Sequence, residues 1–369
     1  MKVMHRAAQL EAAGRDIVHM EVGEPDFDTA ESIIVAAKRA LDEGHTRYTP
    51  APGTPALRAA ISRYYAQHYG VDVASERILV TPGASAGLML LAHLLVGPGD
   101  GVLLADPAYP CVRNFLYLVS GEPQLVPVAA AQNYQPTPAL LDRHRRDNTR
   151  GLWLASPSNP TGTVLDRQRL QELVDSARQW GLHVLVDEIY HGLHYVDDLP
   201  SVLEMSQDAF VVNSFSKYFG MTGWRLGWIV VPSACVEQAN ILAQNLYISA
   251  PAMAQQAALT ALSDETRPEL ERRREAFRQR GDFLATALRD MGFGLPDGVQ
   301  GAFYLYADIS RFSDNAEQFC QDLLETHGVA LTPGTDFGDH DATRHVRFAF
   351  TTSMARLELG VERLRRALA

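Results

Sequence analysis

Residues 182–187, Leu-His-Val-Leu-Val-Asp, decide the fold that this sequence predicts. The run is almost entirely apolar and ends in a carboxylate, a pattern typical of a parallel strand that is buried on both faces. Comparable runs end at turn or polar residues elsewhere in the chain, at residues 77–80, 101–105, 152–155, 210–213 and 225–231. Because longer helix-like segments alternate with these runs, the sequence predicts an α/β fold around a mostly parallel sheet.

The chain is long enough for two domains, since its 369 residues exceed the ~250 to 300 at which one core usually stops growing. Residues 265–291 read as a long amphipathic helix, and residues 301–308 and 344–350 read as strands beyond it. The N-terminal segment, helix-like over 4–13 and extended over 17–22, is expected to join them. We therefore predict a large domain of residues 30–270 and a small α+β domain built from residues 1–29 and 271–369.

Composition narrows the class of protein. Hydrophobic residues make up 46% of the chain and charged residues 21%, as in ordinary globular proteins. The net charge of −11 and the lack of a dense basic run argue against nucleic-acid binding. The longest apolar stretch, residues 88–96, is interrupted by His93 and is too short to span a membrane, and no export signal is evident. Three widely separated cysteines suggest neither disulfides nor zinc, which favours a cytoplasmic protein.

Polar side chains follow the predicted strands, at the edge where open parallel sheets bind ligands. Lys217 follows the run 210–213, where burial and nearby cations would lower its pKa and leave a nucleophilic amine for an aldehyde. Alone, such a lysine is more often a solvated surface residue. Asp187 can cap a helix, or can pair with a pyridinium nitrogen and so keep an aromatic cofactor an effective electron sink. Tyr190 and Asn159 can reach the ring oxygen of that cofactor, although Asn159 by itself is an ordinary turn residue.

A phosphate site is predicted at residues 83–87, Gly-Ala-Ser-Ala-Gly, between a strand and a helix. Free amides and the helix dipole favour an anion there. Ser214 and Arg225 can add a hydroxyl and a charge-assisted hydrogen bond. Tyr109 can stack on the cofactor ring, or can be an ordinary core tyrosine.

Seven motifs then give a resemblance that covers nearly the whole chain: Gly23-Glu24-Pro25-Asp26-Phe27, Tyr48-Thr49-Pro50, Asp106-Pro107-Ala108-Tyr109-Pro110, Ser158-Asn159-Pro160-Thr161-Gly162, Asp187-Glu188-Ile189-Tyr190, Ser214-Phe215-Ser216-Lys217 and Gly223-Trp224-Arg225-Leu226-Gly227. In this order they resemble the class I and II aminotransferases, which are fold type I enzymes dependent on pyridoxal 5'-phosphate (PLP). The resemblance implies a seven-stranded sheet in the large domain.

The resemblance also implies roles for individual residues. It makes Lys217 the Schiff-base lysine, with Asp187 at the pyridine nitrogen and Tyr109 over the ring. The other cofactor contacts that it implies are Asn159 and Tyr190 at the ring oxygen and Ala84, Ser85, Ser214 and Arg225 at the phosphate. Tyr48 would reach the phosphate in the partner subunit, which implies a homodimer with shared active sites. Arg347 would bind the substrate α-carboxylate, with Gly23 and Asn159 beside it.

The expected reaction is a ping-pong transfer of an amino group from an L-amino acid to a 2-oxo acid, with Lys217 as the base that moves the Cα proton. One departure from the family concerns the segment that usually precedes residues 3–10, because this sequence starts almost at that point. The sequence does not identify the amino donor, and no extra cation for an acidic donor can be placed.

Several alternatives remain open at this stage. A β-eliminating lyase of the same fold, or a protein that binds PLP without turnover, would use the same residues. A remote alternative is an α/β-hydrolase with Ser85 as nucleophile, since residues 83–87 also match G-x-S-x-G and His327 lies downstream. Two histidine pairs could suggest a metal, but we expect no metal site and interpret them as solvated or turn residues: His191 with His194, and His340 with His345.

Overall fold

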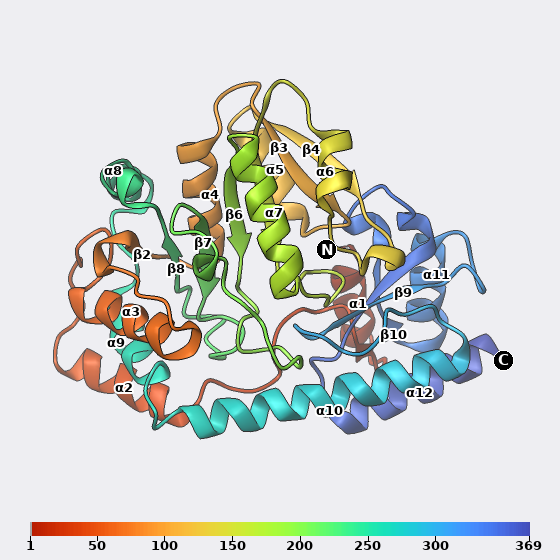
Figure 1. Ribbon diagram of the computed structural model, residues 1–369. Helices are drawn as coiled ribbons and strands as arrows, with labels where there is room; N and C mark the ends of the chain where they lie inside the picture. The colour runs from red at the N-terminus through yellow and green to blue at the C-terminus, as the bar shows by residue number, and fades with distance from the viewer. Residues whose placement is uncertain (1) are drawn as a thin grey trace.

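A seven-stranded sheet forms the centre of the molecule in a computed structural model that describes residues 2–369 (Figure 1). Neighbouring strands are parallel from β4 to β7, whereas β8 is antiparallel to both β7 and β2, so the predicted mostly parallel sheet is confirmed. From edge to edge the order is β2 (Ile78–Thr81), β8 (Gly227–Val230), β7 (Phe210–Ser214), β6 (His183–Asp187), β5 (Thr149–Ala155), β3 (Gly101–Asp106) and β4 (Glu122–Pro127).

Helices cover both faces of this sheet because its strands are apolar on both sides. On β6, Val184 and Val186 pack into one hydrophobic cluster, and Leu185 between them packs into another. The first cluster takes in α2 (Glu31–Asp42), α3 (Pro55–Tyr69), α7 (Arg167–Gln179) and α9 (Ala252–Ala261). The second takes in α4 (Ala84–Leu95), α5 (Pro110–Leu118) and α8 (Val236–Tyr247).

The N-terminal segment lies among C-terminal elements, as Figure 1 shows for the red helix α1 (Lys2–Ala12). Strand β1 (Val18–His19) pairs in parallel with β10 (Val329–Ala330), and Ala7 and Leu10 of α1 pack on Leu324. A three-stranded antiparallel sheet follows the order β11 (Thr332–Pro333), β12 (His345–Ala349) and β9 (Tyr304–Asp308). The expected partnership between the two ends of the chain is therefore present.

A 25-residue helix, α10 (Arg267–Met291), runs along the lower edge of Figure 1 from α2 to α12 (Met354–Leu368). It starts two residues later than predicted and ends at Gly292, whose left-handed φ of 98° suits a helix C-terminus. The boundaries of the two domains, residues 30–270 against 1–29 and 271–369, stay a prediction. The remaining helices are α6 (Pro138–His144) and α11 (Ala316–Asp322).

Two strands differ from the sequence reading for physical reasons. Strand β4 was not among the apolar runs because it lies at the sheet edge, where its burial alternates and Glu122 and Gln124 are tolerated. Residues 225–231 do contain a strand, but β8 runs opposite to its neighbours, and an apolar pattern carries no information on strand direction. Among residues 2–369 no helix is both long and apolar enough to cross a membrane.

Candidate active site

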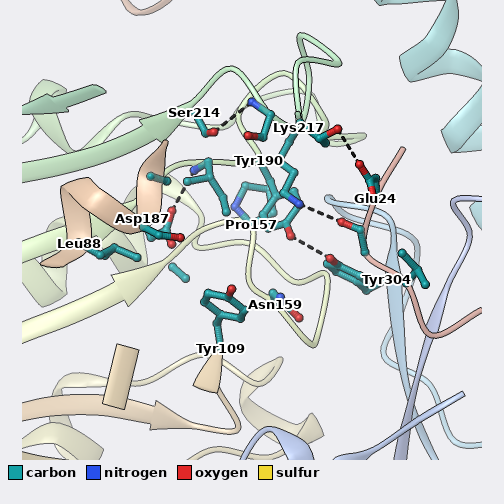
Figure 2. Close-up of a pocket in the computed structure, with 18 of the residues that line it drawn as sticks. Glu24, Leu88, Tyr109, Pro157, Asn159, Asp187, Tyr190, Ser214, Lys217 and Tyr304 are labelled. Carbon is teal, nitrogen blue, oxygen red and sulfur yellow. Dashed lines mark hydrogen bonds between the residues drawn. The ribbon is translucent and has the colours of Figure 1, made fainter. Parts of the chain in front are cut away.

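A cavity of about 490 Å³ opens at the carboxyl edge of the parallel strands (Figure 2). Almost all the residues selected from the sequence line it: Gly23, Ala84, Ser85, Tyr109, Asn159, Asp187, Tyr190, Ser214, Lys217, Arg225 and Arg347. Tyr48 is the exception, because it lies outside the cavity with 82% of its surface exposed. Parallel strands explain the convergence of Asp187 and Ser214, which end β6 and β7 at one edge. Arg225 reaches the same edge because the antiparallel β8 starts there.

Lys217 points its amine into this cavity. Its Nζ donates a hydrogen bond of 2.9 Å to the carbonyl oxygen of Gly23 and lies 5.8 Å from the ring centroid of Tyr190 (Figure 2). Burial lowers the pKa of Lys217 to about 8, and the nearby Arg347 and Arg225 act in the same direction. Far more of this amine is therefore neutral, and hence nucleophilic, near neutral pH than in a solvated lysine.

Asp187 ends β6 with its carboxyl group facing the cavity. Its Oδ1 accepts a hydrogen bond of 3.1 Å from the amide of Ile189, which fixes the side-chain direction. Burial raises the pKa of Asp187 to about 7, against a smaller opposing effect of Lys217. A cation bound beside this carboxyl would favour its ionised form, so the site is suited to a group that brings a positive charge.

Arg347, on β12, contacts two aromatic rings. Its Cζ lies 4.3 Å from the ring centroid of Tyr304 and 4.8 Å from that of Phe337. Nη1 donates to Oδ1 of Asn159 at 2.9 Å, and Nη2 donates to the carbonyl oxygen of Glu21 at 2.6 Å. Nε is buried and has no hydrogen-bond partner within residues 2–369, so a donor is left for an anionic ligand.

The bond from Arg347 also settles how Asn159 is oriented. Because a guanidinium can only donate, the amide oxygen of Asn159 must face it, and the amide nitrogen is free to donate elsewhere. Tyr190 has its hydroxyl 2.9 Å from the hydroxyl of Tyr304. Asn159 and Tyr190 thus both line the cavity, and that they share one ring oxygen stays a prediction.

A second part of the cavity lining, at the start of α4, combines free amides with the positive charge of Arg225, which suits an anion. Helix α4 begins at Ala84, so its first amides are free of intrahelical partners. A Cβ on Gly83 would lie 2.6 Å from Nη2 of Arg225, and a Cβ on Gly227 would lie 2.8 Å from the amide nitrogen of Ala84. Arg225 itself has a left-handed φ of 52°, which is costly for a residue with a side chain. The two glycines and the strained arginine therefore bring charge and amides together beside Ser214.

The sequence reading missed several lining residues, among them Tyr304, Glu24 and Thr222. Tyr304 sits in the predicted strand 301–308, but no local signal showed which of its residues would face the cavity. Glu24 and Thr222 both fall within segments used for the prediction, and Thr222 donates a hydrogen bond of 2.6 Å to Glu24 across the cavity. Only the spatial approach of two distant segments reveals that pair.

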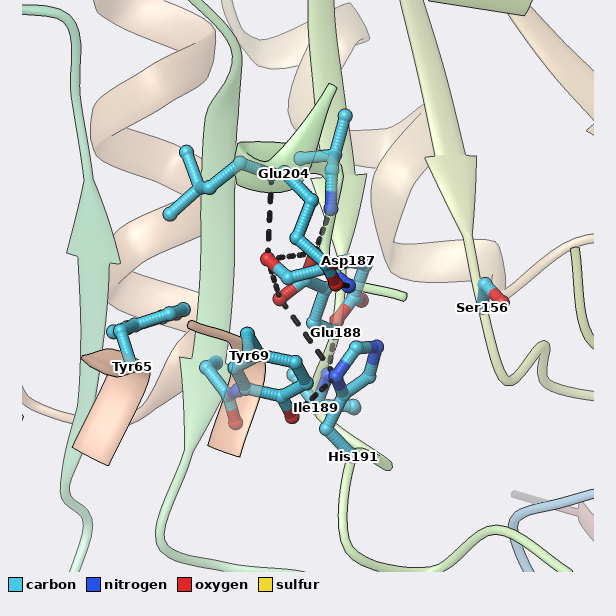
Figure 3. Close-up of polar contacts among 12 residues, drawn as sticks. Tyr65, Tyr69, Ser156, Asp187, Glu188, Ile189, His191 and Glu204 are labelled. Carbon is cyan, nitrogen blue, oxygen red and sulfur yellow. Dashed lines mark hydrogen bonds and ion pairs between the residues drawn. The ribbon is translucent and has the colours of Figure 1, made fainter. Parts of the chain in front are cut away.

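Behind Asp187 lies a buried polar network around Glu188 (Figure 3). The Glu188 carboxyl accepts a hydrogen bond of 2.9 Å from the amide of Val202 and one of 3.0 Å from the hydroxyl of Ser201. His191 is next to it, and its Nδ1 lies 2.7 Å from the hydroxyl of Tyr69. Burial lowers the pKa of His191 to about 3, so this histidine is neutral. The network holds the turn that carries both Asp187 and Tyr190.

Burial also raises the pKa of Glu188 to about 8, well above the ~4.3 of an unfolded chain. The folded protein then binds the extra proton, and its unfolding free energy falls as the pH rises from about 4 to about 8. We expect Glu188→Gln, which cannot ionise, to melt at a higher temperature than the parent at pH 8.5 and to lose that advantage at pH 5. Thermal unfolding of apoprotein at the two pH values measures this. Glu237→Gln, on the exposed side of α8, is the control, and an equal offset at both pH values would contradict the assignment.

The histidines do not support the alternatives raised by the sequence. His191 lies in a turn, as one of the two expected readings had it, although it is buried; His345 is neither solvated nor in a turn, because it starts β12 and contacts the hydroxyl of Tyr134 at 3.0 Å, so the expectation was wrong for His345. Within residues 2–369 no cluster of three or more histidine, cysteine or acidic side chains could hold a metal. The residues that line the cavity include no histidine beside Ser85, and His327 lines a different cavity with Arg363.

Comparison with known proteins shows the family of this chain. The family model described as aminotransferase class I and II matches residues 15–364. The chain is 34% identical to an aspartate aminotransferase of Pyrococcus horikoshii, over all of this chain and 93% of that protein. It is 34% identical to a valine–pyruvate aminotransferase of Mycobacterium tuberculosis, over 99% of this chain and 94% of that protein.

Solved structures give the same result. A crystal structure of an aminotransferase from Mycobacterium tuberculosis superposes with a TM-score of 0.96 at 34% identity, covering 100% of this chain and 95% of the other. Aspartate aminotransferase from Thermus thermophilus with maleate gives a TM-score of 0.94 at 33% identity, covering 99% and 95%. The architecture is thus that of a fold type I transferase. The chain belongs to the class I and II aminotransferase family, whose members carry out PLP-dependent transamination.

Proposed function

We propose that this aminotransferase holds PLP through Lys217 and moves an amino group between an L-amino acid and a 2-oxo acid. The observation that carries the proposal is the amine of Lys217, whose pKa is lowered to about 8, directed into a cavity that also contains Asp187. An amine in this state is matched to attack on an aldehyde.

The donor groups around the cavity fit each part of the cofactor. Asp187 is suited to a protonated ring nitrogen, and the amide of Asn159 and the hydroxyl of Tyr190 to the ring oxygen. The α4 N-terminus, with Arg225 beside it, is suited to a phosphate. We further propose that Tyr109 covers the ring and that Ala84, Ser85 and Ser214 complete the phosphate site.

The bound cofactor would supply an electron sink for the carbanion formed at Cα of the substrate. The chain's own residues supply the rest. Arg347 binds the α-carboxylate of the substrate through its fork of donors, beside the Gly23 backbone, and so orients the Cα–H bond. Once its amine is free, Lys217 takes the proton from Cα of the amino acid and gives up that proton again later in the reaction. Asp187 keeps a negative charge at the ring nitrogen throughout.

Within residues 2–369, the cavity lining offers no spare cation for an acidic substrate side chain. Its three cationic side chains are Lys217, Arg225 and Arg347, and each is already assigned to the cofactor or to an α-carboxylate. An acidic amino acid would therefore have to find its second cation outside these lining residues. Two of the proteins named above are aspartate aminotransferases and one is a valine–pyruvate aminotransferase, so we propose an L-α-amino acid with a 2-oxo acid as the substrate class.

We also propose a cytoplasmic homodimer. Tyr48 is 82% exposed and away from the cavity of its own chain, which suits a side chain that reaches the phosphate in a partner subunit. The cysteines at positions 111, 235 and 320 are all free, as in a reducing compartment. Light scattering that returned only the mass of one chain would contradict the dimer.

The experiment that tests the proposal is borohydride reduction of the protein after incubation with PLP, followed by peptide mass spectrometry. The sequence offers three lysines, Lys2, Lys38 and Lys217, so the position of the label is easily assigned. We expect a yellow protein whose reduced cofactor is found on Lys217 and not on Lys38, which is exposed on α2. A colourless protein, or a label spread over the three lysines, would reject the assignment.

A further inference from the structure

We propose that Tyr304 is a positioning residue of this active site, which orients both the hydroxyl proton of Tyr190 and the guanidinium of Arg347. The inference rests on the proposed roles of those two residues toward PLP and the substrate carboxylate. Tyr304 is the first residue of β9, is 2% exposed and lines the cavity (Figure 2).

The hydroxyl of Tyr304 meets the hydroxyl of Tyr190 at 2.9 Å and has no other hydrogen-bond partner within residues 2–369. Each phenol has a single proton to donate. If Tyr190 gives its proton to the ring oxygen of the cofactor, the bond between the two hydroxyls can persist only with Tyr304 as the donor. Tyr304 therefore selects the rotamer of the Tyr190 hydroxyl that points into the cavity, and its own bond strengthens the donation.

The ring of Tyr304 has a separate task. Cζ of Arg347 lies over this ring, 4.3 Å from its centroid, and also lies 4.8 Å from the ring centroid of Phe337. Contact with aromatic rings restricts where the guanidinium can turn, and so affects the direction of the donors that remain free for a carboxylate. The hydroxyl and the ring thus act on different partners, which makes the two tasks separable by mutation.

A third contact fixes Tyr304 in place. A Cβ on Gly23 would lie 2.0 Å from the Tyr304 hydroxyl oxygen, so the hydroxyl is seated against the Gly23 backbone. The carbonyl oxygen of Gly23 accepts the hydrogen bond from Lys217. Tyr304 is therefore in direct contact with the backbone segment that adjoins the reactive amine.

The test compares three variants of the full-length protein loaded with PLP. Tyr304→Phe removes the hydroxyl and keeps the ring, whereas Tyr304→Leu removes both. Tyr306→Phe is the matched control, because Tyr306 lies on the same strand, is 1% exposed and has a hydroxyl without a partner in residues 2–369. Circular dichroism and melting temperature establish that each variant is folded.

Three measurements are made on each variant: the equilibrium affinity for PLP, the pH at which the visible absorption band changes, and the KM for the amino acid. We expect Tyr304→Phe to bind PLP about 5-fold more weakly, the loss of one hydrogen bond. We expect its spectral transition to move up by about 0.5 pH unit, because a ring oxygen that accepts a weaker bond is more basic. Tyr304→Leu should in addition raise KM several-fold above that of Tyr304→Phe.

Two outcomes would overturn the inference. Tyr304→Phe with the affinity and spectral transition of Tyr306→Phe would remove the role toward Tyr190, and equal KM values for Tyr304→Leu and Tyr304→Phe would remove the role toward Arg347. Failure of the proposed function looks different, because the unmodified protein would then take up no PLP at all.

Discussion

Replacement of Lys217 by alanine is expected to lower the transamination rate at least about a thousandfold, because the same amine attaches the cofactor and moves the Cα proton. Alanine can do neither, and the cavity would retain only its binding contacts. Single-turnover measurements with an amino acid give the rate of the chemical step. Added methylamine, which supplies a free amine to the vacated space, should restore a measurable part of that rate.

Lys38→Ala is the control for this prediction, since Lys38 is exposed on α2 and is not among the residues that line the cavity. It should transaminate at the rate of the unmodified protein. A Lys217→Ala variant that retained more than about a tenth of that rate would exclude Lys217 as the proton carrier.

Replacement of Asp187 by alanine should lower the rate by orders of magnitude as well, for a different reason. Without a carboxylate beside the ring nitrogen the pyridine loses its proton and becomes a poorer electron sink. We expect the loss in kcat, with PLP still attached to Lys217 and a spectrum that responds to pH differently from that of the parent. Steady-state kinetics on PLP-saturated protein measure it.

Asp208→Ala provides the comparison, because Asp208 is an exposed carboxylate in the segment just before β7. It should leave kcat unchanged. Near-normal turnover in the Asp187 variant would remove the role assigned to this residue.

Most of the cavity could be predicted because its residues follow short apolar runs. Asp187, Ser214 and Lys217 come at or just after strand ends, and parallel strands end at one edge whatever the rest of the chain does. The resemblance to the family then supplied Arg347 and Gly23, which no strand-end argument would have brought to the same place.

The parts that could not be predicted depend on distance across the fold. The sequence around Tyr304 does not distinguish it from any other tyrosine in a strand. Its place in the site follows from its contacts with Tyr190 and Gly23, which are far away in the sequence. The reversed direction of β8 is equally invisible, since strand direction is set by the connections and partners of a strand and not by its own residues. The position of His345 was misjudged because its strand pairs with β9, whose residues are far away in the sequence.

The union of the two chain ends has a consequence for biosynthesis. Gly23 lines the cavity, and two residues before it the carbonyl oxygen of Glu21 accepts a hydrogen bond from Arg347, 326 residues further along the chain. While the ribosome is still making the chain, the residues of the central sheet can already pack together. The carbonyl oxygen of Glu21 has to wait for Arg347 until β12, the last strand, has been made. We therefore expect the residues proposed to bind the cofactor to come together first, and the residues proposed to bind the substrate carboxylate to come together only near the end of translation.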